Sequence, residues 1–85
     1  MIKRAQVRLY TRPNCHLCEE MLREMSQAGC AGEYELEKVN IDDDPALKER
    51  YRLLIPVLTI NGTEAFRYSL HAAEFRQRIR AANLD

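Results

Sequence analysis

Alternating apolar and polar side chains mark the first element of the chain, at residues 6–11 (QVRLYT). Val7 and Leu9 fall on one face, and Arg8 and Tyr10 fall on the other. This period of two is typical of a β-strand.

After Asn14 the apolar residues change to a helical period. Leu17, Met21 and Met25 follow one another at intervals of four residues, which predicts one inward-facing stripe on a helix. Gly29 is a residue that commonly ends a helix, because it adopts the left-handed conformation without strain.

Residues 34–41 (YELEKVNI) predict a second strand, although the alternation changes phase around Lys38, where we expect a bulge. Asp44 and Pro45 predict a helix start, with an N-cap followed by proline at the first helical position. A short second helix then has an apolar stripe formed by Leu47, Tyr51 and Leu54.

Residues 57–60 (VLTI) are nearly all apolar, which favours a third strand buried on both faces. Asn61 and Gly62 are a strong hairpin signal, so residues 63–68 should pair back as a fourth strand. We expect Ser69 to cap a last helix, with an inner stripe of Phe75, Ile79 and Ala82.

The predicted order is β-α-β-α-β-β-α, which indicates an α/β fold with a mixed four-stranded sheet and helices on both faces. At 85 residues the chain is long enough for one modest core, so residues 1–85 are expected to form a single domain. With 46% apolar and 31% charged residues, the composition is that of a folded soluble protein.

Charge and hydropathy limit the possible partners. Thirteen basic and thirteen acidic side chains cancel, so no net field favours binding to nucleic acid or to an anionic membrane. The first ten residues (MIKRAQVRLY) contain no long apolar run of the kind found in secretion signals or membrane spans. We therefore expect a cytoplasmic protein, and in that compartment disulfides are rarely structural.

The stretch TRPNCHLC carries the candidate chemistry, because Cys15 and Cys18 form a CxxC where the first strand becomes a helix. Three residues along a helix separate Cα atoms by about 5 Å, within the range of a disulfide. The free amides and the dipole of the helix start favour a thiolate at Cys15, and Arg12 and His16 would add positive charge.

These features predict that Cys15 is a nucleophile and that Cys18, one turn further and facing the core, is the resolving thiol. A metal site would need four ligands, and the candidates are few: Cys15, Cys18, Cys30, His16 and His71. We therefore expect no metal at the cysteines, and Cys30 is interpreted as a small apolar core residue.

Pro56 is a second and independent mark, because it stands directly before a buried strand, where proline needs a special reason. With LYTRPNCHLC, IDDDPALKERY and LIPVLTINGTEAF, the full chain resembles a small glutaredoxin of the thioredoxin superfamily, and most closely the bacterial glutaredoxin-like proteins. The resemblance implies the thioredoxin/glutaredoxin fold and a cis proline at Pro56 that faces the CxxC. It also implies that the backbone of Ile55 pairs with the substrate.

The resemblance further implies that Arg12 meets a carboxylate of glutathione, but other elements differ from the family pattern. His16-Leu17 replaces the usual Pro-Tyr, and residues 66–71 (FRYSLH) lack the glycine pair and acidic residue that cradle glutathione. We expect no bound cofactor, with glutathione acting as a reductant or co-substrate that binds weakly.

The predicted function is therefore thiol–disulfide exchange through Cys15 and Cys18, in a monomer that acts on a disulfide-containing protein or small molecule. His16 and Arg12 would contact the substrate together with Ile55 and Pro56. The alternative is a thioredoxin-fold binding or adapter module whose cysteines are redox-inert or hold a metal.

Overall fold

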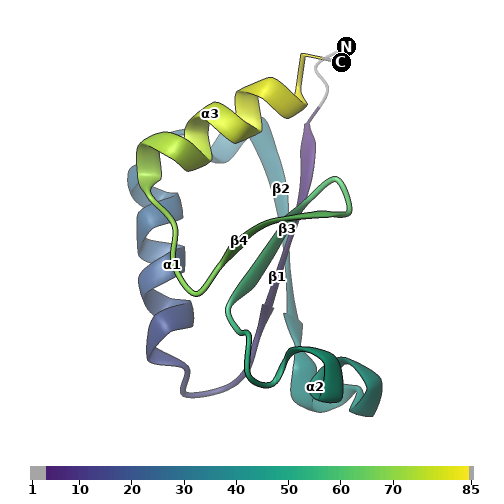
Figure 1. Cartoon of the computed structure of the whole chain (residues 1–85). Helices are drawn as coiled ribbons and strands as arrows, with labels where there is room; N and C mark the ends of the chain where they lie inside the picture. The colour runs from purple at the N-terminus through teal and green to yellow at the C-terminus, as the bar shows by residue number, and fades with distance from the viewer. Residues whose placement is uncertain (1–3, 85) are drawn as a thin grey trace.

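The computed structural model describes residues 4–84, and its elements follow the expected order β-α-β-α-β-β-α (Figure 1). The strands and helices are β1 (Ala5–Thr11), α1 (His16–Gln27), β2 (Tyr34–Asn40), α2 (Pro45–Tyr51), β3 (Val57–Ile60), β4 (Thr63–Arg67) and α3 (Ala72–Ala82). Two short 3-10 turns flank β2, at Ala31–Glu33 and Ile41–Asp43. None of the helices in the described residues is long and apolar enough to cross a membrane.

The four strands form one mixed sheet in the order β2-β1-β3-β4. β1 is parallel to β2 and antiparallel to β3, and β3 pairs with β4 through the expected hairpin. Asn61 and Gly62 turn this hairpin with φ values of 51° and 86°, the left-handed conformation that a tight two-residue hairpin requires.

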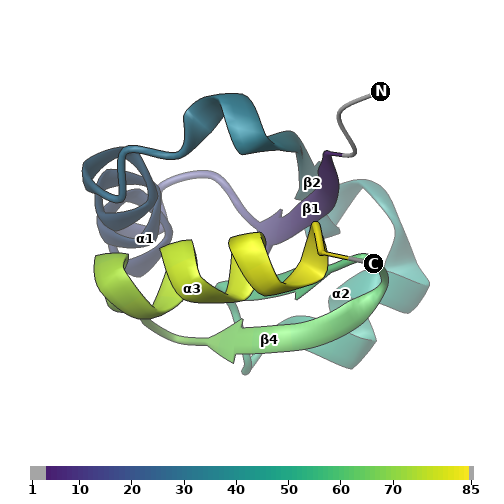
Figure 2. The same ribbon diagram turned by 90° about the horizontal axis from the view of Figure 1, so that it is seen from above.

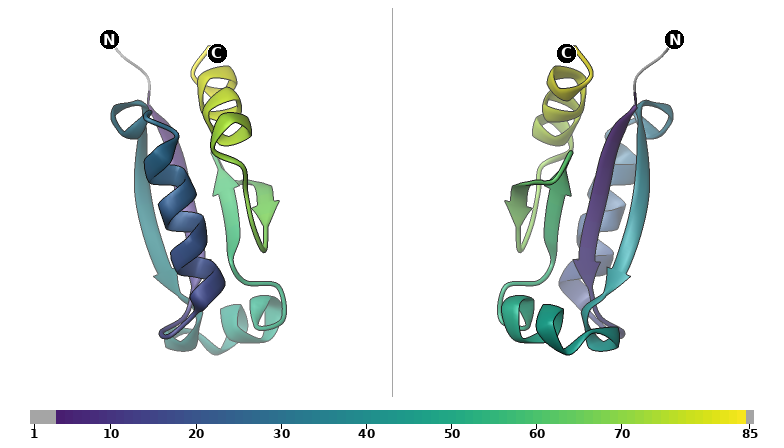
Figure 3. Two further views of the ribbon diagram at one scale, coloured as in Figure 1. Left: turned by 90° about the vertical axis from the view of Figure 1, so that its left-hand side faces the viewer. Right: turned by 90° about the vertical axis from the view of Figure 1, so that its right-hand side faces the viewer.

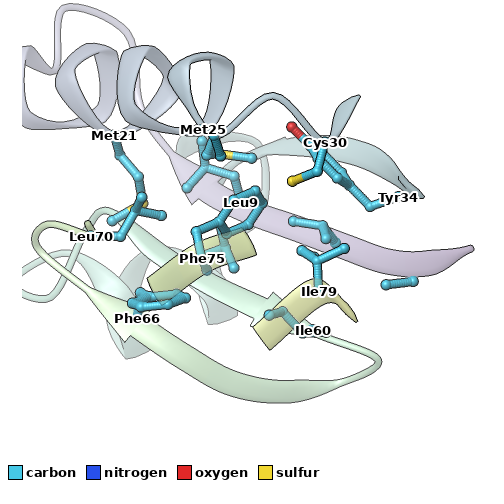
Figure 4. Close-up of a cluster of buried hydrophobic side chains, with 14 residues drawn as sticks. Leu9, Met21, Met25, Cys30, Tyr34, Ile60, Phe66, Leu70, Phe75 and Ile79 are labelled. Atoms are coloured by element: carbon cyan, nitrogen blue, oxygen red, sulfur yellow. The ribbon is translucent and has the colours of Figure 1, made fainter. Parts of the chain in front are cut away.

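Helices α1 and α3 lie side by side on one face of the sheet (Figure 2). Their inner stripes bury the larger apolar cluster, in which Met21 and Met25 of α1 meet Phe75 and Ile79 of α3 above Leu9 (Figure 4). Phe75 also packs edge-on against Tyr34, with ring centroids 5.2 Å apart.

Helix α2 lies at the end of the sheet where β1 and β2 finish (Figure 3). It covers only that end of the second face, where the rings of Tyr10 and Tyr51 stack with centroids 4.5 Å apart. The remainder of this face carries exposed polar side chains such as Arg8, whose Nε lies 2.8 Å from Glu37 Oε1. The expected cover of helices on both faces is therefore complete on one face and partial on the other.

The bulge expected near Lys38 is absent from the described strands at that point, where β1 and β2 pair in unbroken register from Ala5 and Tyr34 to Thr11 and Asn40. The phase change arises because β2 is an edge strand with both faces largely exposed, so its pattern is not constrained by burial. The irregularity of the sheet lies instead between β3 and β4, at Leu58 and Thr59.

The expected start of the last helix at Ser69 is wrong. Helix α3 begins at Ala72, with His71 in the N-cap position and no capping bond from its side chain. The chain first turns back through Tyr68, and Leu70 is then buried in the main cluster before the helix can begin.

Two predicted helical stripes also lose a member at one end. Leu17 is 44% exposed, because it lies at the edge of the helix face on which Cys18, Met21 and Met25 are buried. Leu54 lies outside α2, which ends at Tyr51, although its side chain still packs against the smaller cluster.

Candidate functional site

The two cysteines of the CxxC lie where the chain leaves β1 and enters α1. Pro13 and Asn14 make the turn, with Asn14 in the left-handed region at φ 60°. Cys15 then occupies the N-cap position of α1, with extended backbone angles. The amides of the first helical turn therefore lie beside its sulfur.

Cys15 and Cys18 form a disulfide, and their Cα atoms lie 5.2 Å apart, as the helical spacing predicted. The backbone N–H of Cys18 also donates to Cys15 Sγ at 3.2 Å. The two residues differ in access, since Cys15 is half-buried and Cys18 is only 2% exposed. An incoming group can therefore reach Cys15 more readily than Cys18.

Arg12 lies beside the cysteines, but its charge already has a partner. Its Nη2 donates to Asp42 Oδ1 at 3.2 Å, and both side chains are about one-third exposed. The N–H of Asp42 donates in turn to the side chain of Asn40 at 2.9 Å, which holds the turn after β2. Arg12 thus joins the CxxC loop to the end of β2.

His16 is the first residue of α1, and its side chain is 81% exposed. Its Nε2 lies 3.0 Å from Glu20 Oε1, one helical turn further along. The carboxylate lies on the same exposed face, so it offsets part of any positive charge that His16 carries near Cys15.

The Ile55–Pro56 peptide bond is cis, as predicted, and Pro56 is fully buried. Tyr10 pairs with Val57, so Pro56 lies at the end of the sheet where β1 runs into the CxxC loop. The N–H of Ile55 donates to the carbonyl of Tyr51 at 3.1 Å. The backbone N–H of Ile55 is therefore already bonded within the chain.

Two residues that the sequence reasoning did not select, Lys38 and Asn40, line the same depression as the cysteines. Both belong to β2, and their proximity to the CxxC follows from the parallel register that pairs Lys38 with Leu9 and Asn40 with Thr11. The place of β2 in the predicted βαβ unit is the sequence signal for this proximity. The spacing within the CxxC motif does not contain it.

Cys30 is a free thiol, 2% exposed, and it lies in the main core near Tyr34 (Figure 4). Burial raises the pKa of the Cys30 thiol, which keeps the thiol protonated and unreactive. Its interpretation as a core residue is thus confirmed by its burial. Within residues 4–84, no cluster of three or more His, Cys, Asp or Glu side chains is arranged to hold a metal ion.

The sequence matches the glutaredoxin-like domain (DUF836) family over residues 6–84. This chain belongs to that family. No curated protein sequence shows significant similarity to it.

Solved structures agree with the family assignment. The X-ray structure of target protein XcR50 from X. campestris is 32% identical, with a TM-score of 0.74 over 88% of this chain and 96% of that one. Protein Ne2328 from Nitrosomonas europaea is also 32% identical, with a TM-score of 0.71 over 82% of this chain and 85% of that one. Chloroplastic thioredoxin z, at 18% identity, has a TM-score of 0.74 over 96% and 80% of the two chains, which supports the thioredoxin fold.

The connection from β4 to α3 of this glutaredoxin-like domain has an unusual geometry. The N–H of Ser69 donates to the carbonyl of Arg67 at 2.8 Å across Tyr68, whose φ is 71°. This is a γ-turn with a bulky residue in the left-handed region, a conformation that is rare for a side chain of this size. The N–H of Tyr68 donates to the carbonyl of Pro56 at 2.8 Å, which ties this turn to the loop that contains Ile55 and Pro56, called here the proline loop.

One backbone amide at the start of α3 is also hydrogen-bonded to a side chain of the domain itself. Glu24 of α1 accepts a hydrogen bond from the N–H of Ala72 at 3.2 Å. A carboxylate of the chain thus satisfies one of the free amides that a helix start would otherwise offer to an anion.

Proposed function

We propose that this glutaredoxin-like protein is a thiol–disulfide oxidoreductase that uses Cys15 as the nucleophile and Cys18 as the resolving thiol. The observation that carries the proposal is the asymmetric disulfide at the start of α1, with a half-buried Cys15 and a buried Cys18. A structural disulfide has no need of one accessible sulfur at a helix start, whereas exchange requires it.

In the reduced protein, the amides of the first turn of α1 stabilise the Cys15 thiolate. This thiolate attacks a substrate disulfide, forming a bond from Cys15 to one substrate sulfur while the other substrate sulfur leaves as a thiolate and takes a proton. Cys18, after losing its proton, then attacks Cys15 Sγ and releases the second substrate thiol. Two protein thiols are oxidised to a disulfide, and one substrate disulfide is reduced to two thiols.

We further propose that Arg12, His16, Ile55 and Pro56 contact the substrate around Cys15. Pro56 would form a rigid apolar edge beside the cysteines, and the carbonyl of Ile55 would accept a backbone hydrogen bond from a protein substrate. Arg12 is held by Asp42, so it would bind a substrate carboxylate with a pre-set geometry rather than as a free charge. The cycle suits a reducing compartment such as the cytoplasm, and it requires only a monomer.

Glutathione is proposed as a reductant or co-substrate that binds weakly. The γ-turn at Tyr68 replaces the glycine pair, and Glu24 already accepts the Ala72 amide at the start of α3. A ligand carboxylate placed there would meet the negative charge of Glu24 and compete for the same donor. We therefore expect both cysteines to be required for efficient exchange.

A trapping experiment tests the assignment of roles. Cys18→Ser should accumulate mixed disulfides through Cys15 when exposed to a cell lysate, because the resolving step is removed. Cys15→Ser is the matched control and should trap nothing. Equal trapping by both variants would contradict the roles.

A direct assay then separates an enzyme from an adapter. The wild-type protein should reduce a neutral small disulfide such as 2-hydroxyethyl disulfide, with dithiothreitol as the regenerating reductant. Cys18→Ser should lose most activity on a glutathione mixed disulfide. Full activity of that variant would indicate a monothiol route, and no activity of the wild type on any disulfide would favour the adapter.

A further inference from the structure

A second approach to the disulfide lies between α1 and β2. The depression there, which we call the α1–β2 groove, has a volume of about 330 Å³. Cys15 at the N-cap of α1 and Cys18, Glu19 and Leu22 of α1 line one side, and Lys38 and Asn40 of β2 line the other. None of these positions belongs to the proline loop or to the turn before α3.

Helical spacing and strand register both explain this arrangement. Cys18, Glu19 and Leu22 follow Cys15 by three, four and seven positions, so all three lie on the helix face that Cys15 begins. On the other side, Lys38 pairs in register with Leu9, which is buried beneath α1, so Lys38 lies on the α1 side of the sheet. Helix α1 runs across β1 and β2 in this region (Figure 3).

Lys38 and Glu19 bring charges of opposite sign to the groove. Neither the Lys38 ammonium nor the Glu19 carboxylate forms an ion pair or a side-chain hydrogen bond with any residue from 4 to 84. Arg12 also lines the groove, and its guanidinium is paired with Asp42. A basic and an acidic group therefore flank the cysteines, on β2 and α1 respectively.

We propose that the α1–β2 groove binds low-molecular-weight disulfides of the amino-acid type, which carry a carboxylate and an ammonium close to sulfur. The carboxylate would meet Lys38, with Arg12 beyond it, and the ammonium would meet Glu19. The groove is at the small end of the range for ligand sites, which suits such a molecule better than a folded protein. This inference rests on the proposed function and specifies a substrate class for it.

The chemistry is the exchange already described. The Cys15 thiolate forms a bond to one sulfur of the bound disulfide, the other sulfur leaves as a thiol, and Cys18 then releases the second thiol. The protein dithiol is the reductant for a single turnover, and an added dithiol regenerates it. Two amino-acid thiols are produced for each protein disulfide formed.

The test compares single-turnover rates of pre-reduced protein with four disulfides of different charge. Cystine is zwitterionic, 3,3′-dithiodipropionate is an anion, cystamine is a cation and 2-hydroxyethyl disulfide is neutral. The variants are Lys38→Gln and Glu19→Gln, with Lys48→Gln on α2 as a matched control for the loss of one exposed positive charge. Reactions are stopped with acid, and the remaining protein thiols are counted.

We expect Lys38→Gln to slow the anion and cystine by about two- to five-fold, because an exposed ion pair is lost. The same variant should speed up the reaction of cystamine. Glu19→Gln should speed up the reaction of the anion and slow the reactions of cystamine and cystine. The neutral disulfide should be unaffected, and all differences should shrink at high salt.

Two results would overturn the inference. In the first, Lys38→Gln changes the charged and neutral disulfides equally, or no more than Lys48→Gln does, while the wild type still reduces the neutral disulfide. That outcome rejects the groove and leaves the proposed function intact. In the second, the wild type fails to reduce even the neutral disulfide, and both proposals are then wrong.

Discussion

Helix α1 has cysteines near both of its ends, in opposite surroundings. At its start, Cys15 is half-buried beside free backbone amides and is joined to Cys18. Beyond its other end, Cys30 is enclosed by apolar side chains, and burial raises the pKa of its thiol. The same functional group is thus accessible at a helix start at one end and enclosed in the core at the other, so its position, and not its type, sets its exposure and its pKa.

The largest expected effect is on exchange activity. Cys15→Ser should reduce the rate with 2-hydroxyethyl disulfide to that of the uncatalysed reaction, because the attacking thiolate is lost. Cys30→Ala should retain the wild-type rate, measured in the same coupled assay. A large loss in Cys30→Ala with an unchanged fold would contradict the assignment of Cys30 as a core residue.

Alkylation compares the two environments directly. In the reduced protein at neutral pH, iodoacetamide should modify Cys15 much faster than Cys30, since only the former combines exposure with a helix start. Mass mapping after brief labelling measures the ratio. The difference should disappear in a denaturant, where all three thiols are equally accessible, and equal labelling in the native protein would refute the comparison.

The stability of the oxidised protein should depend on Cys30. Cys30→Ser puts a hydroxyl into the main apolar cluster at a position that is 2% exposed, and we expect the free energy of unfolding to fall by about 1–3 kcal/mol. Urea unfolding measures the change. Ser26→Ala, an exposed position in the last turn of α1, is the matched control and should change stability by less than about 0.5 kcal/mol. A similar small change for Cys30→Ser would mean that the thiol is not tightly enclosed.

The raised pKa of Cys30 also predicts a pH dependence in the oxidised protein, where Cys15 and Cys18 do not titrate. Above the ordinary thiol pKa of about 8.5, the unfolded chain releases a proton that the folded protein retains, so stability falls as the pH rises. Burial raises the pKa of Tyr34 too, which adds a loss of the same sign at higher pH.

Unfolding free energies measured between pH 7 and 10 test this sign. Cys30→Ala should remove the part of the decline that begins near the thiol pKa and leave the part due to Tyr34. An identical decline in Cys30→Ala would assign the whole effect to other groups.

The smallest expected effect is that of His16 on the redox potential. A protonated imidazole stabilises the nearby thiolate and therefore the reduced form, so His16→Ala should make the disulfide harder to reduce. Because Glu20 lies 3.0 Å from the imidazole, we expect a shift of no more than about 30 mV, equivalent to about 1.4 kcal/mol. Titration in glutathione buffers measures it, with His71→Ala as a control at the start of α3. An unchanged potential would leave His16 as an exposed polar residue only.

Much of the fold could be predicted because its signals are local. The hairpin at Asn61 and Gly62, the helix start at Pro45 and the buried strand at residues 57–60 all depend on short stretches of sequence. The incorrect details have a common cause. The bulge near Lys38 and the cap at Ser69 were inferred from local pattern, but the exposure of an edge strand and the burial of Leu70 decided both.

The candidate site divides in the same way. The sequence by itself determined the disulfide pair, because a spacing of three residues at a helix start brings Cys15 and Cys18 within disulfide reach wherever that helix is packed. Only the tertiary structure decided what surrounds the pair. Lys38 lies beside it through the register of β2, and Asp42 holds Arg12 from thirty residues away along the chain. Contacts between residues so distant in sequence form only when the sheet and its helices pack together, and no spacing within a motif encodes them.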